Sequence, residues 1–244
     1  MKKIPLWKKV LGIILTLVAV IGIGGTIYLK QSTYPATESA QILSEQAVDS
    51  KEYDLYSNGQ GNPLSIIFYP GALVAPESYS KWASQVASKG YDVYVVKMPL
   101  NLAVLSPNAA EKIIEANPDK SFVMSGHSLG GVMASRFAAY HLDRVRGMIF
   151  LASYPDEKGS LTSSGIPVLS ITASKDGVLN QEKFQEAKAY LPSQTDYMDI
   201  EGGNHAGFGS YGKQKGDIEA TISNDMQQEE ISSAIVEWLG RVKE

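Results

Sequence analysis

Residues 121–140 read SFVMSGHSLGGVMASRFAAY. An apolar run typical of a buried strand leads into the motif GHSLG (residues 126–130), and an alanine-rich run typical of a helix follows it. A serine on a sharp turn between a strand and a helix presents its hydroxyl at the carboxyl-terminal edge of a sheet, and flanking glycines leave space for that turn. We therefore predict that Ser128 is a nucleophile. The alternative is a glycine-rich turn that only joins the strand to the helix.

Outside this stretch, short β-rich runs alternate with amphipathic segments. We expect strands at 64–69, 92–98, 121–125, 147–152, 167–173 and 195–200, and helices at 76–89, 107–117, 129–141, 180–191 and 228–242. Most of the expected strands are nearly continuous apolar runs, which is typical of strands covered on both faces. The alternation predicts an α/β fold in which a mainly parallel sheet is flanked by helices.

A serine hydroxyl needs a base, and the chain has three histidines. His127 lies within the turn, where we expect its side chain to point elsewhere, and His141 ends the following helix. His205 lies in a glycine-rich loop, EGGNHAGFG (residues 201–209), after the last expected strand. That loop also belongs at a carboxyl-terminal strand edge, so we predict that His205 is the base. The alternative is a surface histidine on a flexible loop.

The base in turn needs a carboxylate on its other ring nitrogen. Asp176 directly follows an expected strand and is the first candidate for this acid. Asp156 and Glu157, which follow the preceding strand, are the alternatives, and an aspartate followed by glycine is also a common turn sequence. With Asp176 as the acid, Ser128, Asp176 and His205 each follow a separate strand.

The composition restricts partners and cofactors. The net charge is −4, but all five charged residues among the first 30 are lysines, so the rest of the chain carries 17 basic against 26 acidic side chains. An acidic body without a basic cluster argues against nucleic acid as a partner. The absence of cysteine excludes disulfides, thiolate metal sites and a cysteine nucleophile. With so few histidines as well, we expect neither a metal nor a cofactor.

Val10–Leu29 form 20 consecutive residues without a charge, preceded by four lysines and followed by one. Twenty helical residues span about 30 Å, the thickness of the hydrocarbon core of a bilayer. The lysines predict a single transmembrane helix over residues 10–29, with the N-terminus in the cytoplasm and the body outside the cell membrane. A cleaved signal peptide is the alternative, although no clear cleavage site follows. A buried core helix is disfavoured because the segment is apolar on every face.

These observations divide the chain into three parts. Residues 1–30 are expected to be a membrane anchor, residues 31–50 a polar tether, and residues 51–244 the α/β domain.

Four short motifs give the body a family resemblance. They are FYPGALV (68–74), GHSLGG (126–131), SKDG (174–177) and GNH (203–205). With these motifs, residues 51–244 resemble the α/β-hydrolase superfamily, and more closely the short bacterial serine hydrolases of alpha/beta-hydrolase family 5, which are related to dienelactone hydrolases. The order serine, aspartate, histidine along the chain is also that of the superfamily. Dienelactone hydrolases use a cysteine nucleophile, which this chain lacks, so their substrate is not implied.

The resemblance implies an oxyanion hole and a reaction. Carried over by position, its donors are the backbone N–H groups of Ala72 and Leu129, although Pro70 stands where the family usually has histidine. The implied reaction is a two-step acyl transfer, in which Ser128 attacks a carbonyl carbon while His205 takes its proton.

Many lipases and esterases of this fold insert a lid between the sixth and seventh strands. Here only residues 153–166 separate the corresponding strands, which is too short for a helical cap. We therefore expect an open cleft and a carboxylesterase that acts on small acyl esters. A thioesterase or peptidase is an alternative activity, and a surface binding module without catalysis is an alternative of a different class.

Overall fold

The computed structural model describes Trp7, Thr16 and residues 22–242 of a chain that divides into two units, residues 1–33 and residues 34–244. In the first unit, residues 22–31 are helical. No helix among the described residues is long and apolar enough to cross a membrane. Most of the span expected over residues 10–29 lies outside the described residues.

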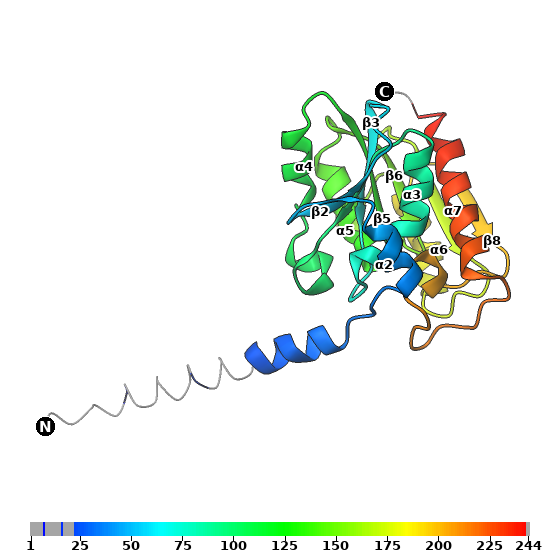
Figure 1. The fold of residues 1–244 in the computed structure, drawn as a ribbon. Helices are drawn as coiled ribbons and strands as arrows, with labels where there is room; N and C mark the ends of the chain where they lie inside the picture. Colours follow the sequence, from blue (N-terminus) through cyan, green and yellow to red (C-terminus); the bar gives the residue numbers. More distant parts are fainter. Residues whose placement is uncertain (1–6, 8–15, 17–21, 243–244) are drawn as a thin grey trace, which may run out of the picture. The chain divides into compact units, whose positions relative to one another are not determined.

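Eight strands in the described part of the second unit form one sheet, in the order β1-β2-β4-β3-β5-β6-β7-β8 (Figure 1). They are β1 (Val48–Asp49), β2 (Tyr53–Tyr56), β3 (Leu64–Tyr69), β4 (Val93–Val96), β5 (Ser121–His127), β6 (Val145–Leu151), β7 (Val168–Ala173) and β8 (Asp196–Ile200). Strands β3 to β8 pair in parallel, while β2 pairs antiparallel with β4 and β1 antiparallel with β2. The predicted, mainly parallel sheet is therefore confirmed.

Helices cover both faces of this sheet (Figure 1). The α-helices in the described part of this unit are α2 (Glu38–Ser44), α3 (Ser80–Ser88), α4 (Ala110–Ala116), α5 (Leu129–Tyr140), α6 (Gln181–Ala187) and α7 (Asn224–Leu239). Trp82 of α3 and Trp238 of α7 pack with one set of strand residues, and Ile113 of α4 and Phe137 of α5 pack with the other. Because alternate strand residues point to opposite faces, the nearly continuous apolar strands supply both cores.

The parallel register brings the carboxyl ends of the central strands to one edge. Tyr69 pairs with Gly126, His127 with Leu151, and Ala173 of β7 with Ile200 of β8. The loops that follow β3, β5, β6, β7 and β8 therefore leave the sheet at this edge, where ligands of open α/β sheets bind.

The expected tether over residues 31–50 is wrong for most of its length. Residues 34–50 contain α2 and β1 and belong to the same compact unit as the sheet. The Thr37 N–H donates to Ser210 O at 2.7 Å, and the Ala40 carbonyl accepts from the Ser80 hydroxyl at 2.7 Å. A short, mostly polar segment gives no apolar periodicity to read, so the sequence did not reveal these contacts.

Candidate active site

Strand β5 carries the GHSLG motif into α5, with Ser128 at the turn. Ser128 has φ +51° and ψ −125°, a left-handed backbone that is strained for a residue with a side chain. Its N–H donates to Leu151 O at 3.0 Å, and its carbonyl oxygen accepts from the Ser153 hydroxyl at 2.6 Å. Both partners lie at the end of β6, so the neighbouring strand holds the strained turn in place.

The glycines of the motif are required because backbone segments meet here. A Cβ on Gly126 would lie 2.5 Å from the carbonyl carbon of Gly130. A Cβ on Gly130 would overlap the carbonyl oxygens of Tyr69 and Pro70. Helix α5 therefore starts against the end of β3, at a separation that no side chain permits.

Asp176 and His205, the predicted acid and base, form a buried pair. His205 Nδ1 lies 2.8 Å from Asp176 Oδ2, and both side chains are almost fully buried. The other carboxylate oxygen, Oδ1, accepts the backbone N–H groups of Val178 and Leu179, each at 2.8 Å. Because the carboxylate only accepts, Nδ1 carries a proton, and in the neutral imidazole the free lone pair is therefore on Nε2.

Ser128 and His205 line one small cavity of about 230 Å³. His205 Nε2 is buried and has no hydrogen-bond partner among the described residues. The cavity is completed by Leu129, Val132, Ala152, Ser153, Tyr154, Val178, Leu179 and Asn180. A proton acceptor without a partner and a serine hydroxyl thus belong to the same cavity.

The alternative acids and the third histidine lie elsewhere. Asp156 accepts from Arg136 Nε at 3.1 Å and pairs with the same guanidinium through a second nitrogen, which lowers the pKa of Asp156. Glu157 is exposed. His141 Nδ1 lies 2.8 Å from Phe137 O, at the end of α5. In the described part of the chain, no group of three or more His, Cys, Asp or Glu side chains is placed to hold a metal ion.

The two implied oxyanion donors lie in the loop after β3 and at the start of α5. Neither the Ala72 nor the Leu129 backbone N–H donates to an acceptor within the described residues. Leu73 has φ +59°, and its N–H donates to Asn101 O at 2.7 Å, which fixes the first of these loops. Unpaired N–H groups at a helix N-terminus and an adjacent loop suit a developing oxyanion.

His127 makes a connection that the sequence did not reveal. Its Nδ1 lies 3.0 Å from the Tyr79 hydroxyl oxygen, which also accepts the Gly71 N–H at 2.9 Å. Tyr79 therefore joins the nucleophile turn to the loop after β3. Burial, and secondarily the repulsion that a protonated His205 would exert, lowers the pKa of His127 well below 6.5, so this ring is neutral.

A mainly parallel sheet whose central strand ends in a serine turn is the architecture of α/β hydrolases. The family model described as alpha/beta hydrolase family matches residues 65–229, more than half of the chain. The chain belongs to this family and is a hydrolase of the α/β class, which confirms the resemblance seen in the sequence. No curated protein matches the chain.

Solved structures show the same fold. A monoacylglycerol lipase from Paleococcus ferrophilus superposes with a TM-score of 0.60 at 15% identity, over 77% of this chain and 97% of the lipase. Est1E from Butyrivibrio proteoclasticus gives 0.58 at 13% identity, over 80% and 99%. A predicted CIB-like hydrolase from Thermoplasma acidophilum gives 0.57 at 18% identity, over 80% and 96%.

Proposed function

We propose that this hydrolase is a serine carboxylesterase that cleaves small acyl esters. The proposal rests chiefly on the buried Asp176–His205 pair. His205 lines the same cavity as Ser128, and its Nε2 has no hydrogen-bond partner among the described residues. The names of the structural neighbours, which include a monoacylglycerol lipase and a thermophilic esterase from Thermogutta terrifontis, agree with ester hydrolysis.

In the proposed reaction, Ser128 Oγ attacks the ester carbonyl carbon while its proton passes to His205 Nε2. Asp176 stabilises the imidazolium that forms, and the N–H groups of Ala72 and Leu129 bind the oxyanion. The imidazolium then donates the proton to the leaving alkoxide, which departs as an alcohol. Water, deprotonated by the same Nε2, cleaves the acyl-enzyme and releases the acid.

The size of the cavity favours small acyl groups. At about 230 Å³ it is smaller than most sites for drug-sized ligands. Residues 152–167, which join β6 to β7, hold only a short 3₁₀ helix, Glu157–Gly159, and no lid. We expect activity to fall for acyl chains beyond about eight carbons and not to rise at a lipid interface. A chain-length series with a maximum at dodecanoyl esters or longer, or a sharp rise on adding micelles, would contradict this.

Labelling with a fluorophosphonate tests the nucleophile. The wild-type protein should form an adduct on Ser128, and Ser128→Ala should lose labelling and nearly all hydrolysis of p-nitrophenyl butyrate while keeping its thermal transition. A variant that keeps more than about a tenth of the activity would contradict the assignment. Absence of any adduct in the folded wild type would favour a binding module. If the adduct forms but thioesters or peptides are hydrolysed faster than esters, the protein is a thioesterase or a peptidase instead.

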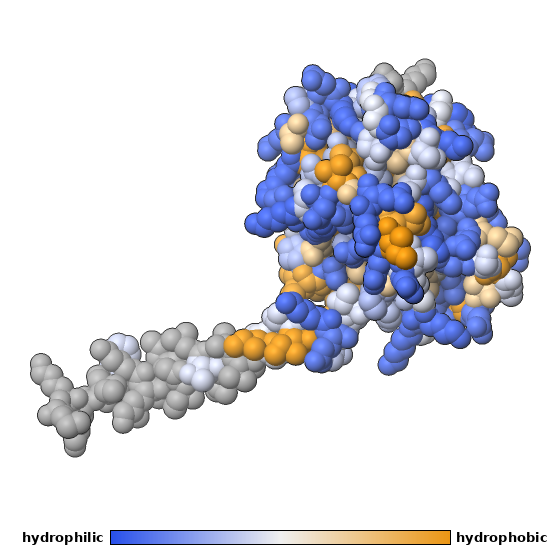
Figure 2. Space-filling view, viewed as in Figure 1, coloured by the Kyte–Doolittle hydropathy of each residue, from blue (hydrophilic) through white to orange (hydrophobic). Residues whose placement is uncertain are grey.

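We also propose that residues 10–29 anchor the protein in the cell membrane, with residues 34–244 outside. The support is the uncharged run with lysines before it, together with the exposed apolar side chains of Ile23 and Ile27 on the described helix. Figure 2 shows apolar residues at the surface of this helix. Protease added to intact cells should digest the catalytic unit, and the mature protein should begin near Met1. A mature chain that starts after residue 30 would show a cleaved signal peptide instead.

A further inference from the structure

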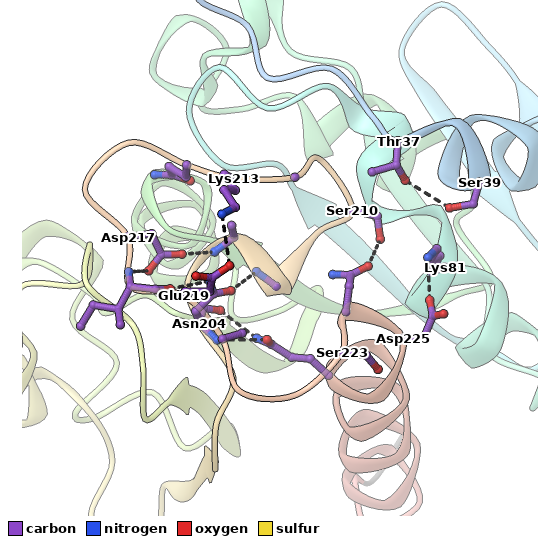
Figure 3. Close-up of a pocket in the computed structure, with 18 residues that line it drawn as sticks. Thr37, Ser39, Lys81, Asn204, Ser210, Lys213, Asp217, Glu219, Ser223 and Asp225 are labelled. Atoms are coloured by element: carbon purple, nitrogen blue, oxygen red, sulfur yellow. Dashed lines mark hydrogen bonds and ion pairs between the residues drawn. The ribbon is translucent and has the colours of Figure 1, made fainter.

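A second, larger cavity lies against the loop that carries His205. It has a volume of about 620 Å³ and is lined by Asn204, Ala206 and Gly207, but not by Ser128 or His205. Figure 3 shows Asp217 at one side of this cavity, on the loop between His205 and α7. Asp217 is half-buried, and the reaction proposed above gives it no role.

The Asp217 carboxylate accepts from two separate loops. Oδ2 accepts the Ala206 N–H at 2.8 Å, and Oδ1 accepts the Ile218 N–H at 2.9 Å (Figure 3). Oδ1 also accepts the Gly177 N–H at 3.0 Å. Gly177 is the residue after Asp176, and Ala206 is the residue after His205. The Asp217 side chain thus connects the acid loop and the base loop, and it binds each loop at the residue that follows the catalytic one.

The segment around Asp217 packs closely against the acid loop at Gly177. A Cβ on Gly177 would lie 2.8 Å from Gly216 O and 2.9 Å from Ile218 N, so the Asp217 segment packs directly on the backbone of the acid loop. Nearer the sheet, the Lys175 N–H donates to Gly203 O at 2.8 Å and already joins the two loops. The Gly202 N–H donates to Ser174 Oγ at 2.8 Å and joins them as well. Asp217 adds a connection beyond the catalytic pair, and together these bonds restrict rotation of one loop against the other.

Gln227 of α7 provides a useful contrast. Its Oε1 accepts the Asn204 N–H at 3.0 Å, and its Nε2 donates to Asn204 O at 2.8 Å. Gln227 is buried and holds the base loop from the residue before His205, but neither of these bonds reaches the acid loop. Asp217 differs because its two oxygens divide between the loops.

We propose that Asp217 is a positioning residue, which keeps His205 Nδ1 in line with Asp176 by accepting the Gly177 and Ala206 N–H groups; this inference rests on the proposed function. Hydrogen bonds to an ionised acceptor are about twice as strong as neutral ones. Displacing a catalytic group by about 1 Å can lower turnover about 100-fold. Asparagine at position 217 has one acceptor oxygen, so either the acid loop or the base loop must lose its partner.

Turnover of purified full-length protein tests the proposal. For Asp217→Asn we expect kcat for p-nitrophenyl butyrate to fall about 10- to 100-fold, with KM within about twofold, after correction for the fraction of sites that react with fluorophosphonate. Glu219→Gln is the matched control, since it removes one negative charge from the same loop, where Glu219 pairs with the exposed Lys213. The control should keep the wild-type kcat.

Proton NMR gives a readout that needs no turnover. The Nδ1 proton shared between His205 and Asp176 should give a resolved low-field resonance in the wild type and in Glu219→Gln, and a broadened or shifted one in Asp217→Asn. A folded Asp217→Asn with kcat within twofold of wild type, or with the wild-type resonance, would overturn the proposal. If Asp217→Asn does not fold, Asp217→Glu, whose carboxylate lies one methylene further out, is measured instead. We expect Asp217→Glu to show a lowered kcat and an altered resonance, and wild-type values of both would equally overturn the proposal.

If the wild-type protein lacks esterase activity, the proposed function fails, but the resonance still tests the role of Asp217.

Discussion

Replacing Asp176 with asparagine exchanges one carboxylate oxygen for an NH₂ group, and the surrounding bonds determine which one. Oδ1 accepts two backbone N–H groups, those of Val178 and Leu179, whereas Oδ2 meets only His205 Nδ1. Leaving a buried donor unpaired costs about 1–3 kcal/mol, so keeping the amide oxygen at the Oδ1 position saves about 2–6 kcal/mol. We therefore expect the NH₂ group to face His205.

That orientation changes the tautomer of the base. An NH₂ group can only donate, so His205 Nδ1 must give up its proton and accept, and the proton moves to Nε2. Nε2 then has no lone pair with which to take the proton of Ser128. A triad in the wrong tautomer loses about 10⁴ in kcat, which corresponds to about 5 kcal/mol of activation free energy.

The assay is steady-state hydrolysis of p-nitrophenyl butyrate, with circular dichroism to establish that Asp176→Asn is folded. The matched control is Asp156→Asn, because Asp156 pairs with Arg136 at the surface rather than with His205. The control should keep kcat and lose at most about 1 kcal/mol of stability. If Asp176→Asn keeps more than a tenth of wild-type kcat, the tautomer argument is wrong. If Asp156→Asn is the inactive variant, the acid belongs to the loop after β6.

Three further predictions concern the frame of the site. Gly130→Ala should unfold the protein or lower its free energy of unfolding by more than about 3 kcal/mol, measured in urea, because the added Cβ overlaps Tyr69 O; wild-type stability would contradict the close approach of helix and strand. Tyr79→Phe should cost about 1–3 kcal/mol and lower kcat, since the Gly71 N–H loses its acceptor; an unchanged kcat would show that this bond does not fix the loop. Because the folded pKa of His127 lies below its unfolded value near 6.5, the unfolded chain binds the proton first as pH falls. Stability should therefore be full above about pH 6.5 and decline below it, by at most about 1.4 kcal/mol per pH unit, and urea titrations of wild type and His127→Gln should differ in this slope.

The sheet and the candidate site were predictable because both depend on local sequence. Buried parallel strands are apolar along their whole length, so β3 is expected at 64–69 and found at Leu64–Tyr69. Loops that follow parallel strands leave the sheet at the same edge, and this argument predicts that Ser128, Asp176 and His205 lie together without any knowledge of the contacts between them.

What the sequence did not reveal depends on contacts between distant segments. Tyr79 and His127 are 48 residues apart, and Asp217 lies 40 residues from Gly177, so no spacing rule connects them. The edge strand β1 and its neighbour β2 are short, β1 is exposed and β2 is only partly buried, which leaves no apolar run to recognise. The expected helix 228–242 is found at Asn224–Leu239, because the Ser223 hydroxyl accepts the Met226 N–H and starts the helix one turn earlier.

Backbone strain is concentrated at the edge of the sheet that carries the candidate site. Among the described residues, five residues other than glycine have a positive φ, namely Leu73, Leu100, Asn101, Ser128 and Ala152. Each such residue costs about 1–3 kcal/mol and persists only where its surroundings impose the conformation. Here the strained segments hold one another or bond to the adjacent strand: Leu73 donates to Asn101 O at 2.7 Å, and Ala152 donates to Ile171 O at 2.9 Å. Because these bonds lie within the protein, the fold itself holds the turn at Ser128 and the loop after β3, and we expect little reorganisation of the proposed oxyanion hole on substrate binding.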